Sequence, residues 1–194
     1  MKWIEDILIK NSDFQQLADK KALINDYFND KTIIIDATET PIQRPKKRQK
    51  QSYSGKKKKH TIKTQVIIEQ ETKKIIATSF SLGKKHDYAL FKESKIPILK
   101  NTKLIVDSGY QGIHKKNHNN VLIPTNKTKK NPLNKEQKQY NRLVSKMRII
   151  IENIFAIIKK FKIITEKYRN RRKRFGLRFN LIASIYNLQL LYLT

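Results

Sequence analysis

The sequence has no cysteine and no long uncharged apolar run. Without cysteine there are no disulfides and no thiolate zinc sites, a composition typical of an intracellular protein. The missing apolar run argues against a membrane-spanning helix. Near the N-terminus, Glu5, Asp6 and Lys10 interrupt any apolar segment that could serve as a secretory signal. The cytoplasm is therefore the expected compartment.

Acidic residues are scarce. The 194 residues contain 16 Asp or Glu against 43 Lys or Arg, which gives a formal net charge of +27. An imbalance of this size indicates a polyanionic partner. An acidic membrane surface is the rival partner, but the most basic stretches lack the hydrophobic face of an interfacial helix. Nucleic acid is therefore the expected partner, with no membrane involved.

The charge also divides the chain. Residues 1–30 hold six acidic and four basic residues, so nearly all of the excess positive charge lies in residues 31–194. Apolar residues at helical spacing, among them Trp3, Ile4 and Ile7, predict that 1–30 is a short helical lead-in. At 38% hydrophobic residues, the remainder is long enough for one domain with a sizeable core.

Hydrophobic patterning predicts the order of the elements. A strand is expected at 32–35, a hairpin from 60–68 and 74–80, a helix at 87–94, and strands at 103–106 and 121–124. Two helices are expected near 135–160 and 177–193, and the basic segment 44–59 reads as a loop because Pro41, Pro45 and Gly55 break it. This order predicts a mixed α/β layer built on one central sheet.

Asp36 and Asp107 each follow a wholly apolar run, 32–35 and 104–106 respectively. An Asp after a strand is most often a turn residue, and that interpretation stays open. However, strands that are apolar on every residue are central and buried, and ligands gather beyond the ends of such strands. Carboxylate oxygens suit Mg²⁺, and two-ion sites of this kind cut and join phosphodiesters.

Glu152 interrupts the apolar stretch 148–155. At about 100° per residue, a narrow polar stripe on its side of the helix contains Ser145, Arg148, Ala156 and Lys159. The opposite side, predicted as the core face, contains Ile150, Ile154, Ile157 and Phe161. A surface pair between Arg148 and Glu152 is the alternative interpretation. A polar stripe on an otherwise apolar helix favours the wall of a site.

His86 and Asp87 are second-tier candidates. Asp87 precedes the helix expected at 87–94, so an N-cap with an incidental histidine is the simpler interpretation. Asp87 is nevertheless one of the few acids in this chain.

Taken in order, these segments resemble the catalytic domain of bacterial DDE transposases, in particular the insertion-sequence-five group. The matching segments are 36–39, 53–61, 83–87, 107–112 and the spaced set Arg148, Glu152 and Lys159. The Tyr that this family places three positions before the Arg is Ser145 here.

The resemblance implies a ribonuclease-H-like fold for 31–194, a mixed central sheet flanked by helices. It implies that Asp36, Asp107 and Glu152 are catalytic and bind two Mg²⁺ or Mn²⁺ ions. The implied activity is hydrolysis at transposon ends followed by strand transfer into target DNA, in a bacterial nucleoid-associated protein. The implied assembly is a homodimer on DNA. Since 1–30 is too short for a full helix-turn-helix, a separate N-terminal DNA-binding polypeptide is a further expected partner.

The basic residues supply the expected DNA contacts, because Lys and Arg neutralise phosphates without reading sequence. These residues are Lys56, Lys57, Lys58, Lys59, Lys63, Arg148, Lys159, Arg171, Arg172, Lys173 and Arg174. A non-catalytic basic nucleic-acid-binding protein would also explain the charge, but not the three acids or the Glu152 stripe. An inactive transposase remnant stays open as a second alternative.

Overall fold

The computed structural model describes residues 17, 20–47, 49–113, 120–128 and 132–192. Most of the helical lead-in expected over 1–30 therefore lies outside the described residues. Its described part forms two 3-10 helices, η1 (Lys20–Ile24) and η2 (Asp26–Phe28).

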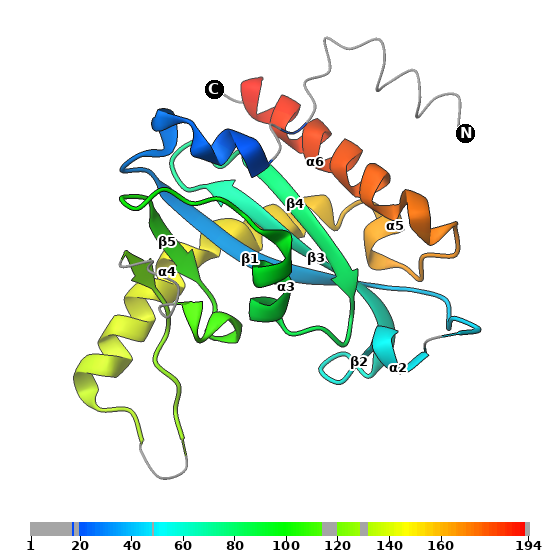
Figure 1. The fold of residues 1–194 in the computed structure, drawn as a ribbon, viewed down its shortest axis with the longest axis horizontal. Helices are drawn as coiled ribbons and strands as arrows, with labels where there is room; N and C mark the ends of the chain where they lie inside the picture. The colour runs from blue at the N-terminus through cyan, green and yellow to red at the C-terminus, as the bar shows by residue number, and fades with distance from the viewer. Residues whose placement is uncertain (1–16, 18–19, 48, 114–119, 129–131, 193–194) are drawn as a thin grey trace.

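The centre of the fold is a mixed sheet (Figure 1). Strand β1 (Thr32–Pro41) pairs antiparallel with β3 (Lys59–Glu69), which pairs antiparallel with β4 (Ile75–Leu82). On its other edge β1 pairs parallel with β5 (Lys103–Val106), and β5 pairs parallel with β6 (Val121–Leu122). The short β2 (Tyr53–Ser54) extends the sheet beside the start of β3. The sequence prediction of a mixed α/β architecture is confirmed.

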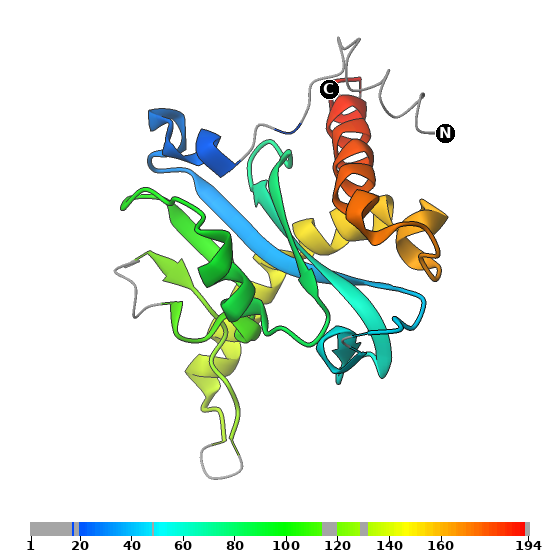
Figure 2. The same ribbon diagram turned by 45° about the vertical axis from the view of Figure 1, so that its right-hand side comes forward.

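Helices cover both faces of this sheet, as Figures 1 and 2 show. One core packs α4 (Lys135–Ile158) and α6 (Phe175–Leu191) against Ile34, Ile105 and their neighbours. The other packs α3 (Asp87–Ser94) and the 3-10 turn η3 (Ser108–Tyr110) against Ile33, Ile35 and Val106. Successive side chains of a strand point to opposite faces, so one apolar run on β1 or β5 serves both cores.

Local sequence explains where α4 begins. Asn134 accepts a hydrogen bond from the Gln137 backbone N–H, and the Gln137 side chain accepts one from the Asn134 N–H. This capping box satisfies two backbone donors at the helix start. The helices not yet named are α2 (Gln49–Ser52), α5 (Lys162–Thr165) and the 3-10 turn η5 (Arg172–Arg174).

Asparagine side chains attach α6 to the outer strand of the hairpin. The Asn187 amide donates to the Ile75 carbonyl at 2.7 Å and accepts from the Ile75 N–H at 2.8 Å. The Thr78 hydroxyl donates to Asn180 at 2.5 Å. Strand β4 therefore meets a helix where an exposed edge would leave unpaired backbone groups.

Three details of the predicted elements are wrong. The segment 44–59, expected as a loop, contains the short helix α2 and the strand β2. β1 does not end at Asp36 but continues to Pro41, because its antiparallel pairing with β3 runs from Ile33 to Pro41. The buried face of α4 is Val144, Ile151, Ile154, Phe155 and Ile158, whereas Ile157 is 36% exposed. The side of α4 next to the Glu152 stripe faces the sheet. This orientation places Arg148 over β1 and β5. No helix within the described ranges is long and apolar enough to cross a membrane.

Candidate active site

Asp36 and Asp107 lie side by side because of strand register. The last parallel pair between β1 and β5 is Ile35 with Val106, so the next residue on each chain is the aspartate. Alternation along the strand puts Asp36 on the face of Ile34, and Asp107 continues the face of Ile105. That face is covered by α4. The predicted neighbouring position of the two carboxylates is therefore present in the fold.

Arg148 of α4 joins these two carboxylates. Its Nη2 donates to Asp36 Oδ2 at 2.8 Å, and its Nη1 donates to Asp107 Oδ1 at 3.0 Å. The Arg148 side chain is only 12% exposed, so both contacts are largely shielded from water. Its Nε is buried and has no hydrogen-bond partner among the described residues. One guanidinium is thus shared by two acids and leaves one of its donors unused.

Burial sets the electrostatics of the pair. Desolvation raises the pKa of Asp36, and the Arg148 charge and the Ala37 N–H (2.7 Å from Asp36 Oδ1) oppose the shift without cancelling it. Burial lowers the pKa of Arg148. The facing charges of Asp36 and Asp107 raise it by a larger amount, so the net shift is upward. The arginine therefore stays charged and supplies the positive charge that this pair of acids requires.

Glu152 lies one helical turn beyond Arg148 and is exposed. Its negative charge contributes to the raised pKa of Arg148, which places it within electrostatic reach of the site. In the part of the chain that the structure describes, no three His, Cys, Asp or Glu side chains gather closely enough to hold a metal ion. The structure thus brings Asp36 and Asp107 together, and it leaves Glu152 at the rim.

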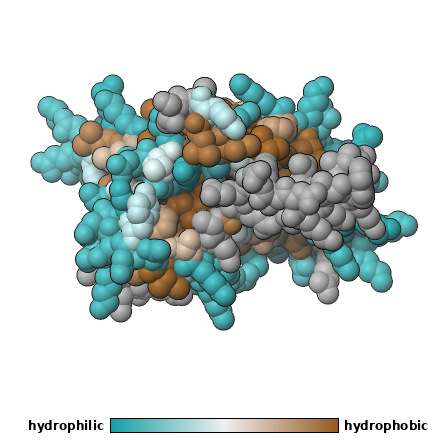
Figure 3. Space-filling view, turned by 90° about the horizontal axis from the view of Figure 1, so that it is seen from above, coloured by the Kyte–Doolittle hydropathy of each residue, from teal (hydrophilic) through white to brown (hydrophobic). Residues whose placement is uncertain are grey.

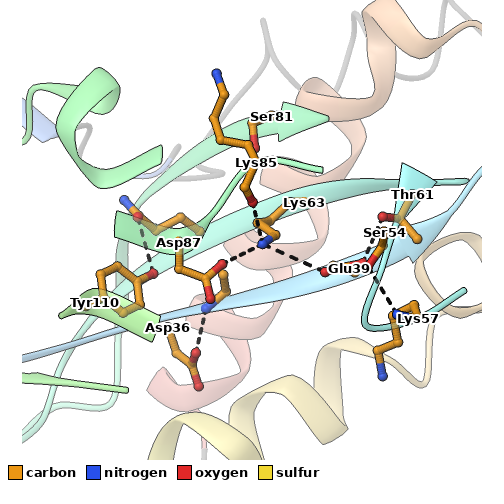
Figure 4. Close-up of polar contacts among 12 residues, drawn as sticks. Asp36, Glu39, Ser54, Lys57, Thr61, Lys63, Ser81, Lys85, Asp87 and Tyr110 are labelled. Atoms are coloured by element: carbon orange, nitrogen blue, oxygen red, sulfur yellow. Dashed lines mark hydrogen bonds and ion pairs between the residues drawn. The ribbon is translucent and has the colours of Figure 1, made fainter. Parts of the chain in front are cut away.

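A second charged cluster occupies the opposite face of the sheet (Figure 4). Glu39 and Lys63 are opposite each other in the β1–β3 register. The Lys63 ammonium donates to Asp87 Oδ1 and to the Lys85 carbonyl, both at 2.7 Å, and lies 3.8 Å from Glu39 Oε1. Lys63 was expected to contact DNA, but it is only 8% exposed and faces these internal acceptors.

Asp87 connects this cluster to the turn after Asp107. It is the first residue of α3 and His86 is the N-cap, so the N-cap interpretation of Asp87 is wrong. A Cβ added at Gly109 would lie 2.7 Å from Asp87 Oδ2, so the η3 turn packs closely on this carboxylate. His86 is exposed. Sequence reasoning missed the cluster, because the first strand was expected to end at residue 35 and Glu39 was therefore not placed opposite Lys63.

Tyr110 ends the same turn and is fully buried. Its hydroxyl donates to Gln65 Oε1 at 3.3 Å. Burial raises its pKa well above the usual value, and the charges of Asp36, Asp87 and Asp107 add to that shift. The three aspartates therefore surround one buried phenol at the end of β5.

Basic side chains surround the β2 end of the sheet. Lys56, Lys57, Lys58 and Lys59 are exposed at the turn between β2 and β3. Desolvation and then repulsion from Lys57 lower the pKa of Lys159, so this turn lies near the end of α4. Hydrophilic side chains also project around the outline seen from above (Figure 3).

The basic run 167–174 reaches the same region. The Tyr168 N–H donates to the Pro41 carbonyl at 2.8 Å, and Tyr168 forms a bridge with Ile42. Arg171, Arg172 and Lys173 are exposed, and Arg174 is half-buried. The turn at 56–59 and the later basic residues, Lys159 and the run 167–174, therefore lie in one region around the end of β1.

The donor set of the Arg148 site fits a divalent cation. Asp36 and Asp107 converge on a single positive group, and Arg148 occupies the position of a cation between them. Carboxylate oxygens are the ligands that Mg²⁺ and Mn²⁺ prefer. Asp107 is the more open of the two, with 31% of its side chain exposed, so a cation has access from solvent.

We predict that Lys63→Met destabilises the fold by about 3 kcal/mol, because breaking a buried ion pair leaves a carboxylate without its counter-charge. Urea unfolding measures the loss, and adding Asp87→Asn should recover part of it. Lys85→Met is the matched control, since Lys85 pairs with exposed Glu93 at the surface and should cost under about 1 kcal/mol. Equal losses in the two variants would contradict a structural role for the Lys63 cluster.

Comparison with known proteins agrees with this geometry. Residues 35–187 match the family described as DDE superfamily endonuclease. A protein of Microchaete diplosiphon, named "Probable transposase for insertion sequence element IS702", is 46% identical over 187 residues, which cover 96% of this chain and 67% of that protein. No solved structure matches the chain. The family match covers most of the chain and includes Asp36, Asp107 and Glu152, and this chain therefore belongs to the DDE superfamily of endonucleases.

Proposed function

We propose that this chain is the catalytic part of a DNA transposase, which hydrolyses the strand at transposon ends and transfers it into target DNA. The observation that carries the proposal is the convergence of Asp36 and Asp107 on one cationic group at the ends of paired parallel strands. Membership of the DDE endonucleases and the transposase name of the Microchaete relative support the same chemistry.

Asp36, Asp107 and Glu152 are the proposed ligands of two Mg²⁺ or Mn²⁺ ions. When bound, such ions activate a water or a DNA 3′-hydroxyl as nucleophile and stabilise the leaving oxygen. Asp36 and Asp107 supply a rigid pair, since both directly follow paired residues of adjacent strands. Glu152, exposed one helical turn beyond Arg148 on α4, is the proposed third carboxylate.

The basic residues have a separate proposed role. Lys56 to Lys59, Lys159 and the cluster Arg171 to Arg174 hold the phosphate backbone and bring it to the two aspartates. Arg148 would join them if a bound metal took over its role as counter-charge to the carboxylates, since its buried Nε has no acceptor among the described residues. Lys63 is better explained as the counter-charge of Asp87 and Glu39.

The fold assignment belongs to the same proposal. Residues 31–194 form a ribonuclease-H-like domain preceded by the lead-in 1–30. Strand order β4-β3-β1-β5-β6, with the first pairs antiparallel and the last ones parallel, supports it. The sequence segments around Asp107 and Glu152 support placement in the insertion-sequence-five group. A homodimer on DNA, and an N-terminal DNA reader supplied by a separate polypeptide, complete the proposed assembly.

The first test is cleavage. Wild-type protein should cut labelled transposon-end DNA when Mg²⁺ or Mn²⁺ is added, and Asp107→Asn should reduce the rate by at least about 10³-fold, on the scale of removing a catalytic group. Asp26→Asn is the control, since Asp26 is exposed and outside the site. Tight DNA binding with no metal-dependent cleavage would instead favour the non-catalytic protein or the inactive remnant.

The second test concerns competition between Arg148 and metal. Arg148→Gln removes a positive charge that bonds both carboxylates. Charge-assisted hydrogen bonds contribute about 1.5–3 kcal/mol each, so Mn²⁺ should bind the DNA-free variant about tenfold or more tightly, as measured by electron paramagnetic resonance titration. The same variant should cleave DNA more slowly. Arg142→Gln, exposed on the same helix, should change neither property. Unchanged or weaker Mn²⁺ binding in Arg148→Gln would show that Arg148 does not occupy the metal position.

The third test concerns salt. Duplex binding should weaken steeply as salt increases, with a log–log slope near 0.9 for each phosphate contacted. Replacing the four lysines at 56–59 with Gln should flatten that slope by up to about 0.9 for each phosphate that the variant no longer neutralises. Four exposed lysines near α3, Lys92, Lys95, Lys100 and Lys103, form a matched set of equal charge. If both sets flatten the slope equally, the turn between β2 and β3 has no special role.

A further inference from the structure

A cavity of about 810 Å³ opens beside β2 and α2, at the basic end of the sheet. Three segments bound it: the start of α2, the turn from β2 to β3, and the loop before α3. Its wall includes Arg44, Lys50, Tyr53, His60, Lys84 and His86. Volumes of this size are typical of pockets for small organic ligands.

The charges of the residues that line the cavity indicate which class of ligand it would bind. Arg44, Lys50 and Lys84 are cationic, and none of the described residues that line the cavity is acidic. Residues 40–68, which supply most of the wall, contain no Asp or Glu. An anion is therefore the favoured occupant, and a carboxylate or phosphate group would meet only positive or neutral side chains.

The aromatic part of the wall is held in position. Tyr53 is 42% exposed, and its ring meets the His60 ring edge-on with 5.5 Å between centroids. His60 is itself fixed, since its Nδ1 lies 2.9 Å from the hydroxyl of buried Ser52. A planar ligand thus finds an exposed phenol whose orientation is set before binding, which reduces the entropy lost on stacking.

The Arg44 side chain and the backbone that carries Lys84 are also held in position. Arg44 donates to Gln49 Oε1 from both Nε (3.0 Å) and Nη2 (2.8 Å). The Lys84 N–H donates to the Gln51 carbonyl at 3.2 Å, which joins the loop before α3 to α2. Gly83 approaches Thr61 so closely that an added Cβ would lie 1.9 Å from its hydroxyl oxygen. The three walls are therefore joined to one another.

We propose that this cavity binds an unpaired nucleotide of a DNA strand, with its base on Tyr53 and its phosphate among Arg44, Lys50 and Lys84. A planar group with an attached anion matches an oriented aromatic ring beside cations, and base–aromatic stacking tolerates any base. In a duplex the base faces are covered by neighbouring pairs, so only an unpaired base can use Tyr53. The proposal rests on the proposed function in taking DNA as the partner.

The cavity is separate from the carboxylate site. His60 lies six positions before Val66 on β3, and Val66 pairs with Asp36. At about 3.3 Å per residue this separation is about 20 Å, or about six nucleotides of a stacked strand at about 3.4 Å each. The nucleotide in the cavity is therefore not the one at the reacting phosphate, and Tyr53 contributes to grip on the strand and not to the chemistry.

The test compares the binding of single-stranded and duplex oligonucleotides of equal length by fluorescence anisotropy. EDTA is present to prevent metal-dependent cleavage. Tyr53→Ala should weaken single-strand binding by about fivefold or more and duplex binding by less than about twofold. Tyr53→Phe keeps the ring and should bind like wild type. Tyr192→Ala is the control, because Tyr192 is 82% exposed at the end of α6.

Several outcomes would overturn the proposal or the proposed function on which it rests. Equal losses for both DNA forms in Tyr53→Ala, or no loss for either, would remove the cavity as a site for unpaired nucleotides. Competition by a free deoxynucleoside monophosphate at the affinity of the oligonucleotide would make a free nucleotide the ligand instead of a strand. Failure of wild-type protein to bind either DNA form would reject the proposed function itself, whereas normal binding that Tyr53→Ala leaves unchanged rejects only the cavity.

Discussion

The shared guanidinium of Arg148 is the contact on which the arrangement of the site depends. Two carboxylates at the ends of adjacent parallel strands repel each other, and burial of Asp36 adds a desolvation cost that raises its pKa. One cation between them opposes both the repulsion of the carboxylates and the rise in the pKa of Asp36. To supply it, α4 must lie across β1 and β5 with its Arg148 flank turned inward, and that orientation determines which isoleucines of the helix are buried. The core packing of α4 and the charge balance of the site are therefore consequences of one geometry.

The opposite face of the sheet repeats this balance with a different cation. Lys63 lies between Glu39 and Asp87 as Arg148 lies between Asp36 and Asp107. Asp87 packs against Gly109, in the turn that directly follows Asp107. Strand β1 and the end of β5 are thus braced from both faces, and the position of Asp107 depends on contacts that no pattern within its own segment reveals.

Local signals predicted much of this molecule. The apolar runs and their breakers gave α3 at 87–94 and β5 at 103–106 with the bounds that the structure has. Tertiary pairing decided the rest. Asp36 looked like a strand end because the apolar run stops there, but pairing with β3 continues the strand to Pro41. Lys63 looked like a phosphate contact because its neighbours in sequence are basic, whereas its partners Asp87 and Lys85 are more than twenty residues away. The buried face of α4 was predicted wrongly because helical periodicity does not show that Arg148 bonds to Asp36 and Asp107.

The two charged clusters differ in whether their cation can be exchanged. Lys63 has a third partner, the Lys85 carbonyl, and Glu39 is further held by the Thr61 hydroxyl at 2.8 Å. Removing that lysine would take the donor from the Lys85 carbonyl and from Asp87, and would leave Glu39 without its nearby counter-charge, which is costly. Among the residues that the structure describes, Arg148 has only carboxylate partners and its buried Nε has no acceptor. It faces Asp107, where solvent reaches the site. A divalent cation that replaced it would satisfy the same two carboxylates and release an arginine toward phosphate. The asymmetry supports the proposal that chemistry takes place on the α4 side of the sheet, with the Lys63 cluster on the α3 side as structural support.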